Sequence, residues 1–129
     1  MFIYCSTTGF GGAILGTSNC ALTFISECFI LECFSACCGG GISTHDASAG
    51  EVSSSRFISC KSALCGGGYY HFNYGDYSLT LSNSLFRTNT AEWEEPGRGG
   101  GGVEDYRRGT YLSKHLFLFF SDNSATTNQ

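Results

Sequence analysis

Proline, methionine and tryptophan each occur only once in this sequence of 129 residues, and charged side chains make up 14% of it. Because one proline cannot fix many turns, the 18 glycines must allow most of the chain reversals. The low charge and a hydrophobic content of 42% exclude a disordered chain. The net charge of −4 excludes the strongly basic surface of a nucleic-acid-binding protein, so we expect no nucleic-acid partner.

Long apolar runs are also missing. Runs such as residues 116–120 are too short to cross a bilayer, so we expect no transmembrane segment in this chain. No signal peptide is recognisable, because Met1 is followed at once by Phe, Ile, Tyr and Cys without a basic region. We therefore expect either a protein that stays inside the cell or a piece of a longer chain whose targeting signal lies elsewhere.

The apolar periodicity of an amphipathic helix is absent as well. Glycine triplets interrupt the chain, and each glycine would cost about 1 kcal/mol in a helix interior. Short alternating stretches occur instead, for example at residues 22–25, 52–57 and 79–82, and they are rich in Thr, β-branched and aromatic residues. These stretches predict short β-strands.

What the sequence does contain is a repeat of about 28 residues. Each copy begins with an aromatic or aliphatic lead residue, and Phe29 fits the second lead position as well as Ile30 does. A glycine run follows nine residues after each of the first three leads and fourteen residues after the fourth. The lead residues are Phe2, Ile30, Phe57, Phe86 and Phe120.

This periodicity predicts an all-β fold, a right-handed parallel β-helix (a solenoid) of about four coils with three short strands per coil. The coils start near residues 2, 30, 57 and 86, with a partial coil at 120, and residues 1–129 form a single domain that is a fragment of a longer solenoid. Equivalent positions would stack about 4.8 Å apart. The rival repeat architectures, leucine-rich and propeller, lack their asparagine-leucine frame and Trp-Asp punctuation here.

Stacking assigns roles to the repeated positions. The lead residues form an inward ladder, the small residues Thr8, Ala36 and Ala63 occupy a tight inside position, and the glycine pairs make a sharp corner. A second ladder lies three residues after each lead. Its members are Cys5, Cys33, Cys60, Asn89 and Asn123.

The eight cysteines all fall within the first 65 residues. They are interpreted first as small buried residues stacked in turns. Disulfides between neighbouring coils are the alternative, since a spacing of about 4.8 Å lies within the usual Cα separation of a bridge. A zinc site at Cys28, Cys33, Cys37 and Cys38 lacks the usual paired spacing, so we expect no metal.

The run Gly11-Gly12-Ala13-Ile14 and the pairs Phe86…Asn89 and Phe120…Asn123 resemble the GGA(I/L/V) and FxxN repeats of the polymorphic outer-membrane protein family. The resemblance covers the chain as a repeat pattern. It implies a β-helical module like an autotransporter passenger domain, at the cell surface or secreted, which adheres to a host-surface protein or a glycan without catalysis. It also implies no cofactor.

The fourth repeat contains five extra residues, in the segment 91–98. Insertions in a solenoid leave the rod as loops, often on the binding face. The candidate binding residues are therefore Trp93, Glu94, Glu95 and Arg98, in which an aromatic ring flanked by carboxylates could stack on a sugar or anchor a protein. The alternative is a solvated acidic loop whose Trp packs back on the rod.

An enzyme is not expected, because the carboxylates do not share one repeat position as paired acid and base groups would. A carbohydrate-active β-helix enzyme, such as a polysaccharide lyase or hydrolase, and a scaffold segment without a ligand remain the alternatives. Unpaired strands at the ends of a solenoid would also allow copies to stack on one another.

Replacing Trp93 by Ala should weaken the binding of a glycan or protein partner and leave the fold intact, because a loop residue contributes to contact and not to the core. Partner binding and circular dichroism of the variant measure the two effects. Loss of the β-sheet signal would show instead that the ring is part of the core.

Overall fold

The computed structural model describes residues 1–17, 24–45, 51–73, 80–93, 101–107, 114–116 and 119–127. Within these residues the secondary structure consists of eighteen short strands, without any helix. All of their pairings are parallel. The all-β class predicted from the sequence is therefore confirmed. In the same part of the chain, no helix has the length and apolar character needed to cross a membrane.

The strands form four parallel sheets, named A to D here. Sheet A consists of β1 (Phe2–Ile3), β5 (Phe29–Leu31), β9 (Arg56–Ile58), β13 (Leu85–Arg87) and β17 (Phe119–Ser121). Sheet B consists of β2 (Ser6–Thr7), β6 (Phe34–Ser35), β10 (Lys61–Ser62), β14 (Thr90–Trp93) and β18 (Ser124–Thr127). Sheet C consists of β3 (Ile14–Gly16), β7 (Ile42–His45), β11 (Tyr69–Asn73) and β15 (Val103–Arg107). Sheet D consists of β4 (Phe24–Ser26), β8 (Glu51–Ser53), β12 (Thr80–Ser82) and β16 (Lys114–Leu116).

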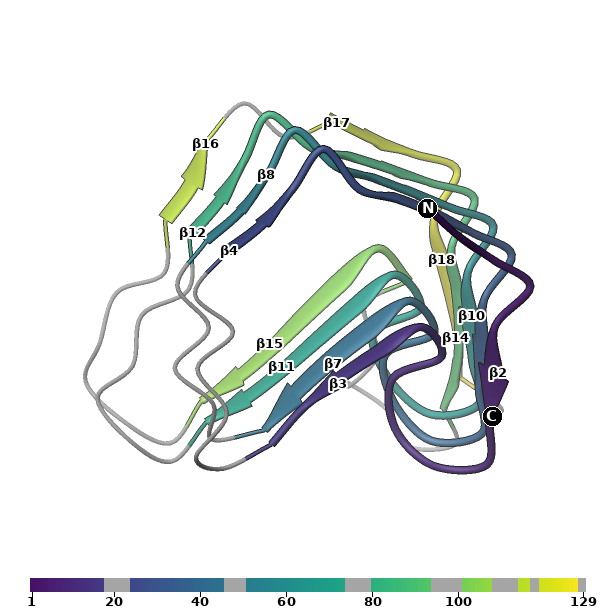
Figure 1. The fold of residues 1–129 in the computed structure, drawn as a ribbon. Coiled ribbons are helices and arrows are strands. Elements are labelled where there is room, and N and C mark those ends of the chain that lie inside the picture. Colours follow the sequence, from purple (N-terminus) through teal and green to yellow (C-terminus); the bar gives the residue numbers. More distant parts are fainter. Residues whose placement is uncertain are drawn as a thin grey trace.

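Each strand from β1 to β14 pairs with the strand four places further along the chain, so each of the first four repeats supplies one strand to each sheet (Figure 1). The prediction of three strands per repeat is therefore wrong, because the described repeats have four. The reason lies in the stretch 52–57, whose alternation suggested one strand. Ser54 has a φ of +48°, and this left-handed residue breaks the stretch into the end of β8 and the start of β9.

The lead residues lie in one column of sheet A. Phe2 pairs with Ile30, Ile30 with Phe57, Phe57 with Phe86 and Phe86 with Phe120. The rings of Phe57 and Phe86 stack with their centroids 4.6 Å apart, and those of Phe86 and Phe120 with theirs 5.3 Å apart. The structure thus selects Ile30 as the second lead residue, because Phe29 pairs with Arg56 in the neighbouring outward position.

The column belongs to the main hydrophobic core. Ile30, Phe57 and Phe86 are fully buried, and Ile42 and Tyr69 of sheet C pack into the same cluster. A smaller cluster lies at the turn between sheets B and C, where Cys38, Cys65 and Tyr70 are buried together. Successive residues of a strand point to opposite faces, so Tyr69 packs into the main core on one face of sheet C and Tyr70 into the smaller cluster on the other.

A sharp corner joins each strand of sheet A to the following strand of sheet B. The corner residue lies two positions after each lead and has a left-handed φ, between +49° and +54°, at Tyr4, Glu32, Ser59, Thr88 and Asp122. A non-glycine residue in this conformation costs roughly 1–2 kcal/mol. The cost is offset by backbone pairing, since four of these corner N–H groups donate to a carbonyl of the next repeat.

The residue after each corner points inward and forms the second ladder. The side chain of Asn89 is fully buried; its Nδ2 donates to the carbonyl of Phe57 at 2.9 Å and its Oδ1 accepts from the N–H of Cys60 at 2.9 Å. Asn123 repeats this pattern, because its Nδ2 donates to the carbonyl of Phe86 at 2.8 Å and its Oδ1 accepts from the N–H of Asn89 at 3.0 Å. The side-chain amides therefore hydrogen-bond successive repeats to one another.

Thiols occupy the same ladder in the earlier repeats. The thiol of Cys60 lies 3.5 Å from the carbonyl of Ile30, and that of Cys33 lies 3.9 Å from the carbonyl of Phe2. A thiol can replace the donor function of the amide toward the lead carbonyl, but it is a weaker donor and a weaker acceptor. Cys5 lies at the partly exposed start of the column.

The small residues expected inside sheet B are placed differently. Thr8 and Ala36 are exposed and Ala63 is half-buried, whereas Ser35 and Ser62, one residue earlier, are fully buried. The reason is the alternation of a strand. Because the ladder residues at 33 and 60 point inward, the residues two positions later also point inward, and the third position turns outward.

Glycine is required at the turn that leads into sheet C. Gly66 has a φ of +60°, and a Cβ added there would lie 2.5 Å from the carbonyl oxygen of Tyr69. At Gly67 a Cβ would lie 2.6 Å from the backbone of Thr90 in the next repeat. The first glycine thus permits the turn, and the second permits the close approach of neighbouring repeats.

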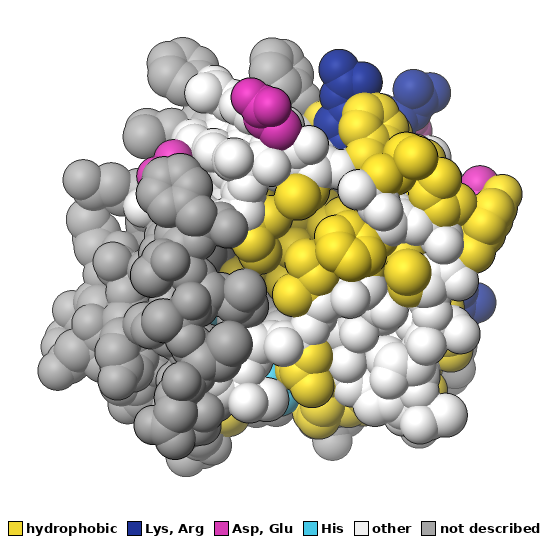
Figure 2. Space-filling model, in the orientation of Figure 1, with side chains coloured by type: hydrophobic (Ala, Val, Ile, Leu, Met, Phe, Trp, Pro, Cys, Tyr) yellow, Lys and Arg dark blue, Asp and Glu magenta, His cyan; other side chains and the backbone are white. Residues whose placement is uncertain are grey.

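Apolar side chains gather on one face of the stack. Figure 2 shows hydrophobic side chains gathered on the face that is viewed in Figure 1. The strands β1 to β4 lie at one end of their sheets, and among the described side chains of the first repeat the exposed large apolar ones are Met1, Ile3, Tyr4 and Leu15.

Replacing Gly66 by Ala should lower the free energy of unfolding by about 2 kcal/mol or more, because an L-residue is strained at this φ and its Cβ meets backbone. Urea denaturation measures the change. Gly9→Ala is the matched control, since the nearest atom to a Cβ at Gly9 is 3.9 Å away. Equal destabilisation by the two variants would contradict the assigned role of Gly66.

Replacing Asn89 by Ala should lower the free energy of unfolding by about 3 kcal/mol, because the carbonyl of Phe57 and the N–H of Cys60 lose their partner. Asn89→Cys should cost roughly half as much, since a thiol keeps a donor for that carbonyl, as Cys60 does one repeat earlier. The ranking is read from urea denaturation midpoints. Equal costs for the two variants would show that the ladder acts only by filling space.

Candidate functional site

The binding residues predicted from the sequence lie largely outside the described part of the chain. The backbone of Trp93 ends β14 and pairs with Thr127 of β18. Glu94, Glu95 and Arg98 lie outside the described residues. The insertion therefore stays a sequence-based candidate, and the site that the structure does describe lies at another corner of the repeat.

This second corner joins each strand of sheet D to the following strand of sheet A. Its left-handed residues are Glu27, Ser54 and Asn83, with φ between +46° and +53°, and all three are exposed. Their backbone N–H groups continue the ladder, since Glu27 donates to the carbonyl of Ser53 and Ser54 donates to that of Ser82. The corner thus presents one outward polar side chain per repeat, in a fixed column.

The residues that follow this corner point inward and form a ladder of their own. The hydroxyl of Ser55 donates to the carbonyl of Ser53 at 2.8 Å and accepts from the N–H of Cys28 at 3.2 Å. The hydroxyl of Ser84 accepts in the same way from the N–H of Ser55, at 3.2 Å. These bonds fix the corner, so the outward side chains beside it are held by a rigid backbone.

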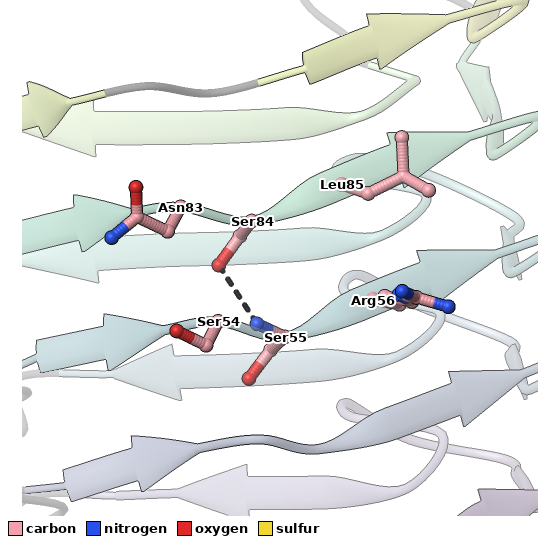
Figure 3. Close-up of a pocket in the computed structure, with 6 residues that line it drawn as sticks. All are labelled: Ser54, Ser55, Arg56, Asn83, Ser84 and Leu85. Carbon is pink, nitrogen blue, oxygen red and sulfur yellow. Dashed lines mark hydrogen bonds between the residues drawn. The ribbon is translucent and has the colours of Figure 1, made fainter.

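A pocket of about 400 Å³ opens at this corner. Figure 3 shows that its walls come from two neighbouring repeats, with the hydrogen bond from Ser55 to Ser84 between them. The lining residues are Ser54, Ser55, Arg56, Asn83, Ser84 and Leu85. Its exposed polar side chains are those of Ser54, Asn83 and Arg56, because the hydroxyls of Ser55 and Ser84 are buried and bonded to backbone groups.

Arg56 supplies the positive charge of the pocket. Its backbone pairs with Phe29 on one side and Leu85 on the other, and its guanidinium lies 5.0 Å from the centroid of the Phe29 ring. This cation–π contact orients an exposed arginine at little entropic cost. By contrast, Lys61 on sheet B forms an ion pair with Glu92 at 2.5 Å, which neutralises its charge.

These groups are suited to binding. The guanidinium of Arg56, the hydroxyl of Ser54 and the carboxamide of Asn83 can hydrogen-bond to carboxylate and hydroxyl oxygens of a ligand. The lining residues include no carboxylate or imidazole that would act as a general acid or base. Across the described residues, no group of three or more His, Cys, Asp or Glu side chains is placed to hold a metal ion, and Cys28, Cys33, Cys37 and Cys38 do not form one.

Comparison with protein-family models, with curated proteins and with solved structures gives no match. The function is therefore inferred from the described residues themselves.

The corner pocket was not predicted from the sequence. A signal was present, since Cys28, Ser55 and Ser84 are separated by 27 and 29 residues, the same spacing as the lead residues beside them. The signal was weak because serine is abundant in this chain and because the first copy has Cys28 at this position in place of serine. Only the left-handed backbone at Ser54 and Asn83 distinguishes the corner from a continuous strand.

Proposed function

We propose that this chain is a right-handed parallel β-helix that serves as a non-catalytic adhesion module at the cell surface. Its ligand is an acidic glycan that binds at the corner pocket around Arg56. The observation that carries the proposal is the pocket itself, whose lining from two successive repeats includes the oriented guanidinium of Arg56, the exposed hydroxyl of Ser54 and the carboxamide of Asn83.

The β-helix is supported by the pairing of every strand with the strand four places on, in parallel register. Such a stack repeats each outward position about every 4.8 Å along its length. An extended polymer can follow a column of this kind, because successive units meet equivalent groups. Ser54 and Asn83, which line the pocket, belong to such a column of polar side chains, and Glu27 occupies the same position one repeat earlier.

An acidic glycan fits the chemistry of this corner better than an apolar or protein ligand. Hydroxyl and carboxamide groups pair with sugar hydroxyls, and the guanidinium pairs with a carboxylate through two parallel hydrogen bonds. The pocket contains only one large apolar side chain, Leu85, whereas the centre of a protein interface is usually built around buried aromatic or apolar anchors.

Two further proposals accompany this site. Passenger-domain-like localisation at the surface of a cell, or secretion, follows from the resemblance of the repeats to polymorphic outer-membrane proteins. Stacking of one copy on another is supported by the apolar face with Ile3, Tyr4 and Leu15 and by the position of β1 to β3 at the ends of their sheets.

Replacing Arg56 by Ala should weaken the binding of an oligogalacturonate, a chain of carboxylated sugars, at least fivefold, because the charge-assisted hydrogen bonds are lost. Arg87→Ala is the matched control: it removes a positive charge that is also exposed, from the next repeat and outside the pocket, and should change affinity less than twofold. Titration calorimetry at constant salt measures both affinities.

Equal losses in the two variants would show non-specific attraction by charge and would contradict the pocket. A neutral oligogalactan should bind at least fivefold more weakly than the oligogalacturonate. The appearance of new reducing ends or of unsaturated sugar products during the incubation would contradict the non-catalytic role and favour a lyase or hydrolase.

A further inference from the structure

Two cysteine sulfur atoms from neighbouring repeats lie unusually close together. The Sγ atoms of Cys38 and Cys65 are 2.7 Å apart. This distance is shorter than the normal approach of two non-bonded sulfur atoms, although longer than the covalent bond of a disulfide, about 2.05 Å. The two atoms would need only a small further approach to form a covalent bond.

The fold explains why these residues meet. Cys38 and Cys65 each directly precede the first glycine of a glycine run, and the N–H of Gly39 donates to the carbonyl of Cys65 at 2.8 Å. Both lie in the turn between sheets B and C and not in a strand.

The surroundings protect the pair. Cys38 is 3% and Cys65 is 6% exposed, and both pack in the cluster with Tyr70, Leu64 and Phe72. Hydrogen bonding to Cys65 and burial raise the pKa of the Cys38 thiol well above its ordinary value. The neighbouring Cys37 is half-buried, and burial raises its pKa to about 11. Thiols with raised pKa values exchange slowly, so a bond formed here would be persistent.

The cysteines of the ladder behave differently. The thiol of Cys60 approaches the carbonyl of Ile30 at 3.5 Å, and the thiol of Cys33 approaches the carbonyl of Leu31 at 3.3 Å. These thiols are occupied as hydrogen-bond donors to backbone oxygen. The thiols of Cys33 and Cys60 also interact with each other. In the turn pair the two sulfur atoms approach to 2.7 Å.

We infer that Cys38 and Cys65 are a disulfide-forming pair that covalently joins two successive repeats under oxidising conditions. The oxidant is a small-molecule disulfide such as glutathione disulfide. One cysteine, as the thiolate, attacks a glutathione sulfur and releases one glutathione. The other cysteine then attacks the mixed disulfide and releases the second glutathione. The cysteine pair loses two electrons and two protons, and the glutathione disulfide gains both.

The test uses the full chain, unfolded, reduced and then refolded in a mixture of reduced and oxidised glutathione. The refolded protein should be lighter by two hydrogen atoms. Digestion after glutamate without reductant should yield a linked pair of peptides, one that begins after Glu32 and one that begins after Glu51. Fragmentation should place the bond between Cys38 and Cys65. Free thiols at both positions, or a bond from Cys37 to Cys65, would overturn the inference.

Variants separate this bond from other cysteine chemistry. Cys38→Ser and Cys65→Ser should each abolish the linked peptides, whereas Cys37→Ser, which changes the adjacent thiol, should keep them. Oxidation should raise the melting temperature of the wild type and of Cys37→Ser by roughly 10 °C, because the bond closes a long loop in the unfolded chain. An equal rise in Cys38→Ser would overturn the assignment.

Discussion

Parallel backbone hydrogen bonding between repeats is the constraint on which this structure depends. Because Phe2, Ile30, Phe57 and Phe86 pair in one register, every other position of the repeat is also forced above its equivalent. Each side chain must therefore pack against the side chains at the equivalent positions of the neighbouring repeats. Aromatic rings stack in the core, and glycines allow backbones to meet where a Cβ would collide. The stability of the fold comes from the stacking of equivalent residues and not from any single strand, since the strands are only two to five residues long.

The corners carry the second level of organisation. At each one a left-handed residue turns the chain, and the next residue sends a small polar side chain inward to bond backbone groups of its own or the neighbouring repeat. Asparagine, serine and cysteine can all occupy this inward position, because each has a short side chain with a hydrogen-bond donor. This explains much of the cysteine content without invoking a metal. The pair Cys38 and Cys65 stands apart, because the turn into sheet C brings two sulfur atoms together in place of a sulfur and a carbonyl.

The proposed function depends on the same geometry. Rigid corners hold outward side chains in a line, so the pocket around Arg56 is assembled from residues that are far apart in sequence yet adjacent in the stack. Arg56 and Asn83 belong to different repeats, and neither would be noticed as a site in its own segment. The ring of Phe29, one repeat away, completes the arrangement by orienting the guanidinium. A repeat fold can thus create a binding surface without any motif that is local in the chain.

The sequence by itself determined the all-β class, the period of the repeat, the lead column and the position of the glycine corner. It could do so because stacking demands the same residue type at the same position in every copy, and that demand is visible as periodicity. Only the tertiary structure decided that there are four strands per repeat, that Ser35 and Ser62 rather than Ala36 and Ala63 point inward, and that the pocket lies at the corner of Ser54. These features follow from the sign of φ at single residues and from contacts across repeats, and neither is encoded by residue type, since serine adopts strand and left-handed conformations alike.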